Sequence, residues 1–164
     1  DDTANDTFLF DQGPTRGLGK VQFHDYRIAY DSVDLPNVDT FKKQIEAFTG
    51  FLAKATPDEK QSKDIDYLLA VGDCFCLVAY GQLILENKTI FEVSDALMDE
   101  IFDFMIRDFS KYALTIYSKP SNSDLQRELS MKIIKAPLAN AERFDSIWQE
   151  HVYALKGQYK MRDE

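Results

Sequence analysis

The sequence predicts an all-α fold, an antiparallel helical bundle of about five helices with an irregular N-terminal arm. From residue 37 onward, apolar residues recur at spacings of three and four, the period of an amphipathic helix. The breaks in that pattern fall at residues that start or stop helices. The chain has 164 residues, of which 45% are hydrophobic, and this suits one domain with one core. We therefore expect a helical bundle domain over residues 37–164 and an arm over residues 1–36.

The first two helices are expected over about 37–55 and about 57–86. The seam of the first comprises Val38, Phe41, Ile45, Phe48, Leu52 and Ala55. At the start of the second, Thr56 precedes Pro57, and Glu59 follows three residues after Thr56. This is the arrangement of a capping box with proline in the first helical position. The pattern therefore predicts a helix that begins at Pro57.

The second helix is apolar enough over residues 67–85 to approach the length of a membrane span. Asp73 lies near its centre, where insertion into a bilayer would cost roughly 2.5 to 3.5 kcal/mol. The ends lack a clear pattern of Trp, Lys or Arg anchors. We therefore expect a central helix of the bundle, buried on most sides by its neighbours, and no membrane partner.

The third helix is expected over about 94–118, with Ser94 at its start. Its wide apolar face consists of two adjoining stripes, so it should contact more than one neighbour. Asp103 and Arg107 lie one turn apart on the other side, and we expect a solvated ion pair there. The surrounding carboxylates Asp99 and Glu100 are also expected to be solvated.

Two further helices complete the predicted bundle. One is expected over about 122–135 because Lys119-Pro120 ends the preceding helix and Ser121 or Ser123 can cap the next. The other begins near Asn140 and ends at Gly157. Its expected apolar stripe comprises Phe144, Ile147, Trp148, His151 and Leu155. The short loops join antiparallel neighbours.

Residues 1–36 are expected to form a docking arm, because the glycines and proline of residues 13–19 interrupt any helical period. Exposed aromatic residues in such numbers mark an interface, and basic residues add charge-assisted contacts. The expected docking residues are Phe8, Phe10, Arg16, Lys20, Phe23, Tyr26, Arg27 and Tyr30. A chain truncated to start at Asn37 is accordingly expected to stay folded. The spacing from Gly13 to Gly19-Lys20 does not match a P-loop.

Charge and cysteine content exclude several classes of partner. Nineteen Lys and Arg against 28 Asp and Glu give a formal net charge of −9, which disfavours nucleic acid and anionic lipid. Cys74 and Cys76 are the only cysteines and point about 200° apart on a helix, so they cannot bind one metal or form a disulfide. We expect both in the core, in a cytoplasmic protein.

No catalytic, cofactor-binding or metal-binding residue is predicted. His24 and His151 lack a second ligand at metal-binding spacing, and no Ser-His-Asp set has supporting spacing. Asp73 and Asp108 lie close to apolar stripes, where a carboxylate needs a partner or a raised pKa. We expect Asp73 to be buried and paired; either aspartate could be structural or functional.

Three stretches carry a resemblance to a known family. They are FDQGPTRGLGK with FHDYR (residues 10–20 and 23–27), YGQLILE (80–86) and IFDFMIRDFS (101–110). Together they resemble the C-terminal region of a long bacterial subclass of acyl-CoA dehydrogenases, where an additional helical domain follows the flavin-binding fold. The resemblance covers nearly the whole chain, although none of these motifs is a catalytic signature.

The resemblance implies a parent enzyme of fatty-acid β-oxidation that uses FAD to convert an acyl-CoA to a trans-2-enoyl-CoA. In that family the catalytic glutamate and the flavin lie in upstream domains, so we expect no FAD in this chain and no activity from it alone. The implied partners are the upstream flavin-binding domains of the same polypeptide, within a homo-oligomer of the parent. The implied role is structural, shielding the surface that a second dimer would occupy. The alternative is a stand-alone helical protein-interaction module.

Overall fold

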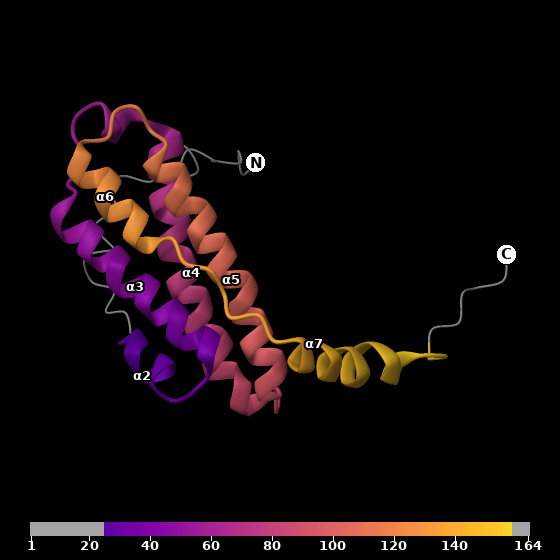
Figure 1. Ribbon diagram of the computed structural model, residues 1–164. Helices are drawn as coiled ribbons and strands as arrows, with labels where there is room; N and C mark the ends of the chain where they lie inside the picture. Colours follow the sequence, from indigo (N-terminus) through magenta and orange to yellow (C-terminus); the bar gives the residue numbers. More distant parts are fainter. Residues whose placement is uncertain (1–24, 159–164) are drawn as a thin grey trace, which may run out of the picture.

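The computed structural model describes residues 25–158, and these form a bundle of helices without a β-strand (Figure 1). The predicted all-α bundle is confirmed. Its α-helices are α2 (Tyr26–Tyr30), α3 (Pro36–Lys54), α4 (Ile65–Ile90), α5 (Asp95–Tyr117), α6 (Asp124–Ile133) and α7 (Ala141–Ile147). A 3₁₀ turn (Gln61–Lys63) precedes α4, and α7 continues into a π turn (Trp148–Val152) and a 3₁₀ turn (Tyr153–Leu155).

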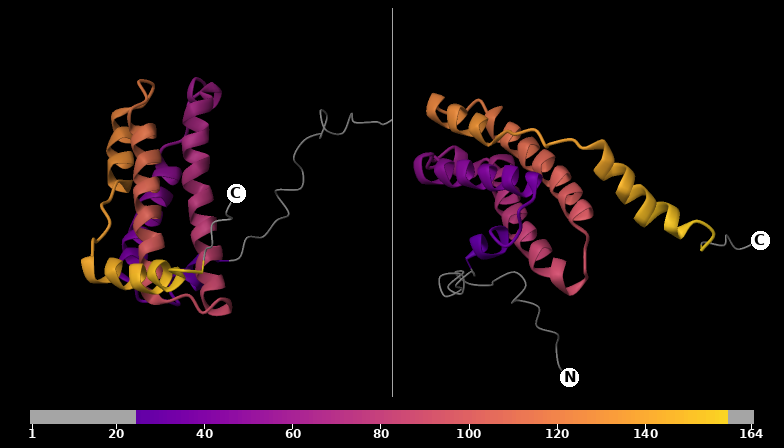
Figure 2. Two further views of the ribbon diagram at one scale, coloured as in Figure 1. Left: turned by 90° about the vertical axis from the view of Figure 1, so that its right-hand side faces the viewer. Right: turned by 60° about the horizontal axis from the view of Figure 1, so that its bottom comes forward.

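Helix α5 is the centre of the fold, because it packs against α3, α4, α6 and α7. Helix α3 also packs against α6, whereas α4 packs mainly against α5 and the short α2. Figure 2, left, shows the result: α4 lies at one side of the bundle, separated from α6 by α5. One long helix is therefore left at the edge.

Four aromatic rings join α3 to α5. The ring of Phe41 meets the rings of Phe102 and Phe109 edge to face, each at 5.4 Å between centroids. Phe48 meets Phe109 in the same way at 5.5 Å. Such pairs add about 0.5–1.5 kcal/mol each beyond the area that they bury. Most of the predicted seam of α3 is buried as expected, but Leu52 is 47% exposed.

Helix α4 begins at Ile65, and the predicted start at Pro57 is wrong. The Asp58 carboxylate accepts hydrogen bonds from the backbone N–H groups of the second and third residues after it, both at 2.8 Å. This local bonding holds a turn in place of a helix. Asp64 caps α4 instead. Lys119 donates to its carboxylate at 2.9 Å and so lowers the pKa of Asp64.

A buried amide cluster ties that turn to the start of α6. The side-chain amide of Gln61 donates to Asn122 Oδ1 at 3.1 Å and to Gln126 Oε1 at 3.0 Å. All three side chains are buried. Buried amides need such partners, so the chain before α4 is fixed by α6 and not by its own helix propensity.

The N-terminal arm is not irregular throughout, because Tyr26–Tyr30 form α2 against α4. Tyr30 is fully buried, stacks on Phe41 and donates its hydroxyl hydrogen to the Val78 carbonyl at 2.9 Å. Burial raises the pKa of this hydroxyl, so it remains a neutral donor. Tyr30 is therefore a core residue and the docking role expected for it is wrong. The structure also opposes the expectation that a chain starting at Asn37 stays folded.

The last helix is shorter than the expected segment ending at Gly157, and it leaves the bundle. From α7 to Leu155 the chain extends away from the other helices (Figure 1). Phe144, Trp148, His151 and Leu155, all expected to face the core, are exposed. Their stripe is real, but no element among residues 25–158 lies close enough to cover it.

The contact between α2 and α4 can be tested at two glycines of one helix. A Cβ added at Gly81 would overlap the Tyr30 hydroxyl, whereas one added at Gly72 has no atom within 4 Å. We expect Gly81→Ala to lower the free energy of unfolding by about 1–3 kcal/mol through overpacking. Gly72→Ala should raise it by up to about 1 kcal/mol, because alanine is the better helix former. Urea denaturation measures both, and equal effects would contradict this packing.

Candidate interaction surfaces

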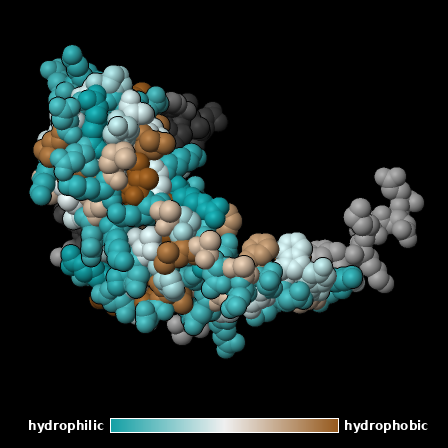
Figure 3. Space-filling view, in the orientation of Figure 1, coloured by the Kyte–Doolittle hydropathy of each residue, from teal (hydrophilic) through white to brown (hydrophobic). Residues whose placement is uncertain are grey.

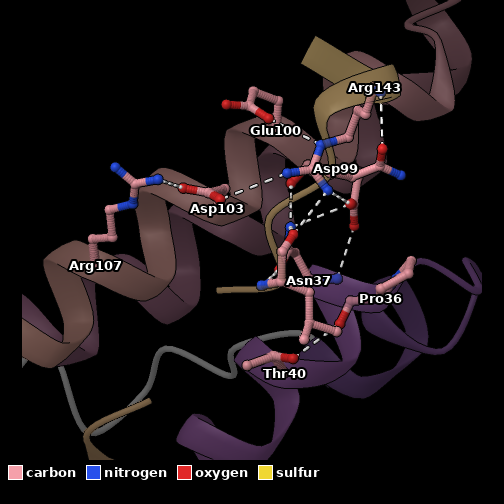
Figure 4. Close-up of polar contacts among 10 residues, drawn as sticks. Pro36, Asn37, Thr40, Asp99, Glu100, Asp103, Arg107 and Arg143 are labelled. Atoms are coloured by element: carbon pink, nitrogen blue, oxygen red, sulfur yellow. Dashed lines mark hydrogen bonds and ion pairs between the residues drawn. The ribbon is translucent and has the colours of Figure 1, made fainter. Parts of the chain in front are cut away.

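A charge network joins α7 to the centre of the bundle (Figure 4). The buried guanidinium of Arg143 forms ion pairs with Asp99, with Glu100 at 2.9 Å and with Asp103 at 3.6 Å. All three carboxylates come from α5. Asp103 is also paired with Arg107, one turn further along the same helix. Among residues 25–158, Arg143 is thus the one cation that another helix brings to this α5 cluster.

Asn37 extends the network to α3. Its backbone N–H donates to Asp99 Oδ1 at 2.8 Å, and its side-chain amide donates to the Asp99 carbonyl oxygen at 3.2 Å. Its Oδ1 accepts from the backbone N–H of Leu138 at 2.7 Å, in the segment that leads to α7. Three parts of the chain that are distant in sequence therefore meet at Asp99.

The carboxylates of this network were expected to be solvated, and for Asp99 and Asp103 that expectation is wrong, since they are 4% and 2% exposed. A buried carboxylate is costly unless a cation and hydrogen bonds compensate it. Sequence reasoning missed Arg143 as the compensating cation. The available signal was the clustering of acidic residues within little more than one turn of α5, which calls for a cation from elsewhere.

The side chains singled out for chemistry do not come together. Asp73 is half-buried with no hydrogen bond or ion pair in the described structure, so the buried, paired position expected for it is wrong, and Asp108, expected close to an apolar stripe, is exposed. Cys74 is buried, and burial raises the pKa of its thiol to about 12, whereas Cys76 is exposed, contrary to expectation. Among residues 25–158, no cluster of three or more His, Cys, Asp or Glu is placed to hold a metal ion.

Helix α4 has an apolar face on the side away from the bundle as well as on its inner side, and we call the outer one the α4 outer surface. Its inner face is buried through Tyr67, Ala70, Cys74 and Leu85. On the opposite side, apolar or small residues continue along the helix, and they comprise Ile65, Leu69, Gly72, Cys76, Ala79, Tyr80 and Leu83. By length and composition alone α4 is also sufficient to cross a bilayer. Described elements cover only one side of a helix that is apolar on both.

The C-terminal extension, residues 141–155, carries a row of exposed aromatic rings. Phe144 stacks on Trp148 at 6.2 Å between centroids, and Trp148 meets Tyr153 edge to face at 6.0 Å. The π turn places Trp148 and Tyr153 on the same side despite their spacing of five. Figure 3 shows the extension standing clear of the bundle. Its rings are therefore available to a surface outside the described chain.

The remaining docking residues have different outcomes. Arg27 is exposed on α2, with its guanidinium over the ring of the half-buried Tyr26 at 5.6 Å. Both stay candidates for an interface. The other predicted docking residues lie outside the described part of the chain, and they are Phe8, Phe10, Arg16, Lys20 and Phe23.

Comparison with known proteins identifies no relative. No protein-family model, no curated protein and no solved structure matches the chain. The similarity of residues 10–27, 80–86 and 101–110 to acyl-CoA dehydrogenases therefore stays a resemblance. What the chain offers for a functional assignment is its own geometry, namely the two uncovered surfaces.

The charge network predicts a large cost for removing its cation. Arg143→Met leaves Asp99 buried without a cation, while Asp103 keeps Arg107, and we expect the free energy of unfolding to fall by about 3–5 kcal/mol. Arg143→Lys keeps the charge but loses the planar fork that spans several carboxylates, so an intermediate loss is expected. Arg127→Met is the control, because the exposed pair of Arg127 with Asp124 should be worth less than about 1 kcal/mol. Urea denaturation that shows similar losses at Arg143 and Arg127 would contradict the role of the network.

Proposed function

We propose that this chain is the C-terminal accessory domain of an FAD-dependent acyl-CoA dehydrogenase, with a structural role in the oligomer of that enzyme. The observation that carries the proposal is the C-terminal extension, which leaves the folded bundle (Figure 1) and exposes the rings of Phe144, Trp148 and Tyr153. Aromatic residues exposed together in this way are typical of a surface that packs against another body. The role is to cover a surface of the enzyme, not to do chemistry.

The stretches that resemble the family support a structural role because they contain packing residues. In residues 80–86, Gly81 makes room for Tyr30. In residues 101–110, Phe102 and Phe109 fill the core and Asp103 belongs to the charge network. Residues of this kind specify a fold, so a shared pattern at these positions is what a shared accessory domain would require.

The accessory domain that we propose holds no FAD. The groove between α4 and α5, about 420 Å³ in volume, is lined by Asp66 and Asp73 as well as by lysines. Two aspartates and two lysines leave this groove with no net positive charge to attract the pyrophosphate of the dinucleotide. In the proposed parent enzyme, flavin and catalytic base belong to the upstream domains, and this chain contributes neither. The purified chain should accordingly be colourless.

The alternative function is a stand-alone helical interaction module. The exposed α4 outer surface favours this module as much as it favours the accessory domain. The reading frame upstream of Asp1 separates the two. A flavin-binding fold encoded there supports the accessory domain. A reading frame without one leaves the interaction module as the better account.

The proposed docking can be followed at Trp148, the single tryptophan of the chain. We expect its emission to shift to shorter wavelength when the upstream flavin-binding body, produced separately from the same reading frame, is added, because docking removes the 43% exposed indole from water. Phe144→Ala should weaken this association about tenfold or more, as for a residue at the centre of an interface. The control is Leu125→Ala on α6, which removes an equally exposed apolar side chain.

Two results would count against the proposal. One is Trp148 emission that is unchanged by a saturating amount of the flavin-binding body. The other is a yellow preparation of the isolated chain with flavin absorbance, since that would place the cofactor in this domain.

A further inference from the structure

The α4 outer surface has a pattern that is complementary to itself. Along the outermost line of the helix, Leu69, Gly72, Cys76 and Leu83 recur at spacings of three, four and seven. Tyr80 flanks this line. If two α4 helices lie antiparallel with Cys76 at the centre, residues at equal distances before and after Cys76 face each other. Leu69 then meets Leu83 of the second copy, and Gly72 meets Tyr80.

We propose that two copies of this chain pair through the α4 outer surface, antiparallel about a two-fold axis at Cys76. Such an axis makes the contact isologous, since one patch serves on both copies. Gly72 is suited to its position, because nothing lies within 4 Å of the place where a Cβ would be. The ring of Tyr80 from the second copy has room over that glycine. The pairing requires only this chain and does not depend on the proposed function.

Charge opposes a second copy least at this surface. The whole chain has a net charge of −9, so two copies repel each other over most of their surfaces. Between Leu69 and Leu83 the only charged residue is Asp73, and it lies toward α5, where it shares a groove with Lys111. The α4 outer surface is therefore where a chain of the same charge is accepted at the lowest electrostatic cost.

The available area is sufficient for a specific dimer. Leu69, Tyr80 and Leu83 are between 54% and 59% exposed. The helix has 26 residues, which is about 39 Å at 1.5 Å per residue. Side chains exposed to this degree along the helix amount to roughly 600 Å² per copy, so a pair would bury at most about 1,200 Å², the lower end of stable specific interfaces.

A disulfide at the axis tests the geometry. The full chain at tens of micromolar is treated with copper phenanthroline in air, where two Cys76 thiols and O₂ give a disulfide and H₂O₂. We expect a covalent dimer on a non-reducing gel, because facing positions of closely packed helices lie within the Cα separation that a disulfide needs. Cys74→Ser should leave the yield unchanged. Cys76→Ser should abolish it.

Charged substitutions at facing positions test the register of the two helices without a covalent bond. By sedimentation velocity we expect a dimer for the native chain and a monomer for Leu83→Glu, which places a carboxylate in the apolar seam. Leu69→Lys combined with Leu83→Glu should restore the dimer, since these side chains meet across the axis. Leu114→Glu, on the exposed side of α5, is the control that should remain dimeric. Circular dichroism confirms that each variant is helical.

Three results would overturn the proposal. The first is a native chain that sediments as a monomer up to hundreds of micromolar. The second is a double variant that stays monomeric while helical, which excludes this register. The third is a chain whose Cys76 is protected from alkylation only when phosphatidylcholine vesicles or the flavin-binding body are added, which assigns the surface to a membrane or to another protein.

Discussion

The contact of Arg143 with the carboxylates of α5 is the interaction on which the arrangement depends. Asp99 and Asp103 are buried near the start of α5, and a buried carboxylate is tolerated only with a cation and hydrogen bonds. Arg143 supplies the cation from α7, and Asn37 supplies hydrogen bonds from α3. The same contact therefore closes the bundle and fixes the point from which the C-terminal extension leaves it.

This arrangement determines which surfaces stay uncovered. Helix α5 is occupied on several sides by α3, α4, α6 and α7, so α4 is left at the edge with a second apolar face. The extension is held at its base by Arg143 and carries its aromatic rings away from the bundle. The first surface follows from the packing around α5, and the second from the buried ion pairs that hold α7. In both functions proposed for the chain, these surfaces contact another body.

The sequence predicts the elements better than their ends or their neighbours. Helical periods gave α3, α5 and α6 because each has an apolar stripe and a recognisable start or stop. The start of α4 was missed for two reasons. Asp58 bonds the backbone just after it and holds a turn, and Gln61 bonds Gln126 of α6, a contact that the local sequence does not show. Arg143 was missed because a charged residue on a short helix gives no periodic signal.

The aromatic stripe of the extension was found, but periodicity cannot tell whether the chain itself covers it. Tyr30 was assigned to an interface because the sequence pattern does not show that the chain itself buries this ring.

The most direct test is a mutant cycle that removes the cation and the carboxylates separately and together. The free energy of unfolding is measured for Arg143→Met, for Asp99→Asn with Asp103→Asn, and for the combination of all three. The account predicts that the combination is more stable than Arg143→Met alone by about 2 kcal/mol or more, because no buried charge is then left uncompensated. Losses that simply add would contradict it, since they would show that Arg143 does not neutralise these carboxylates.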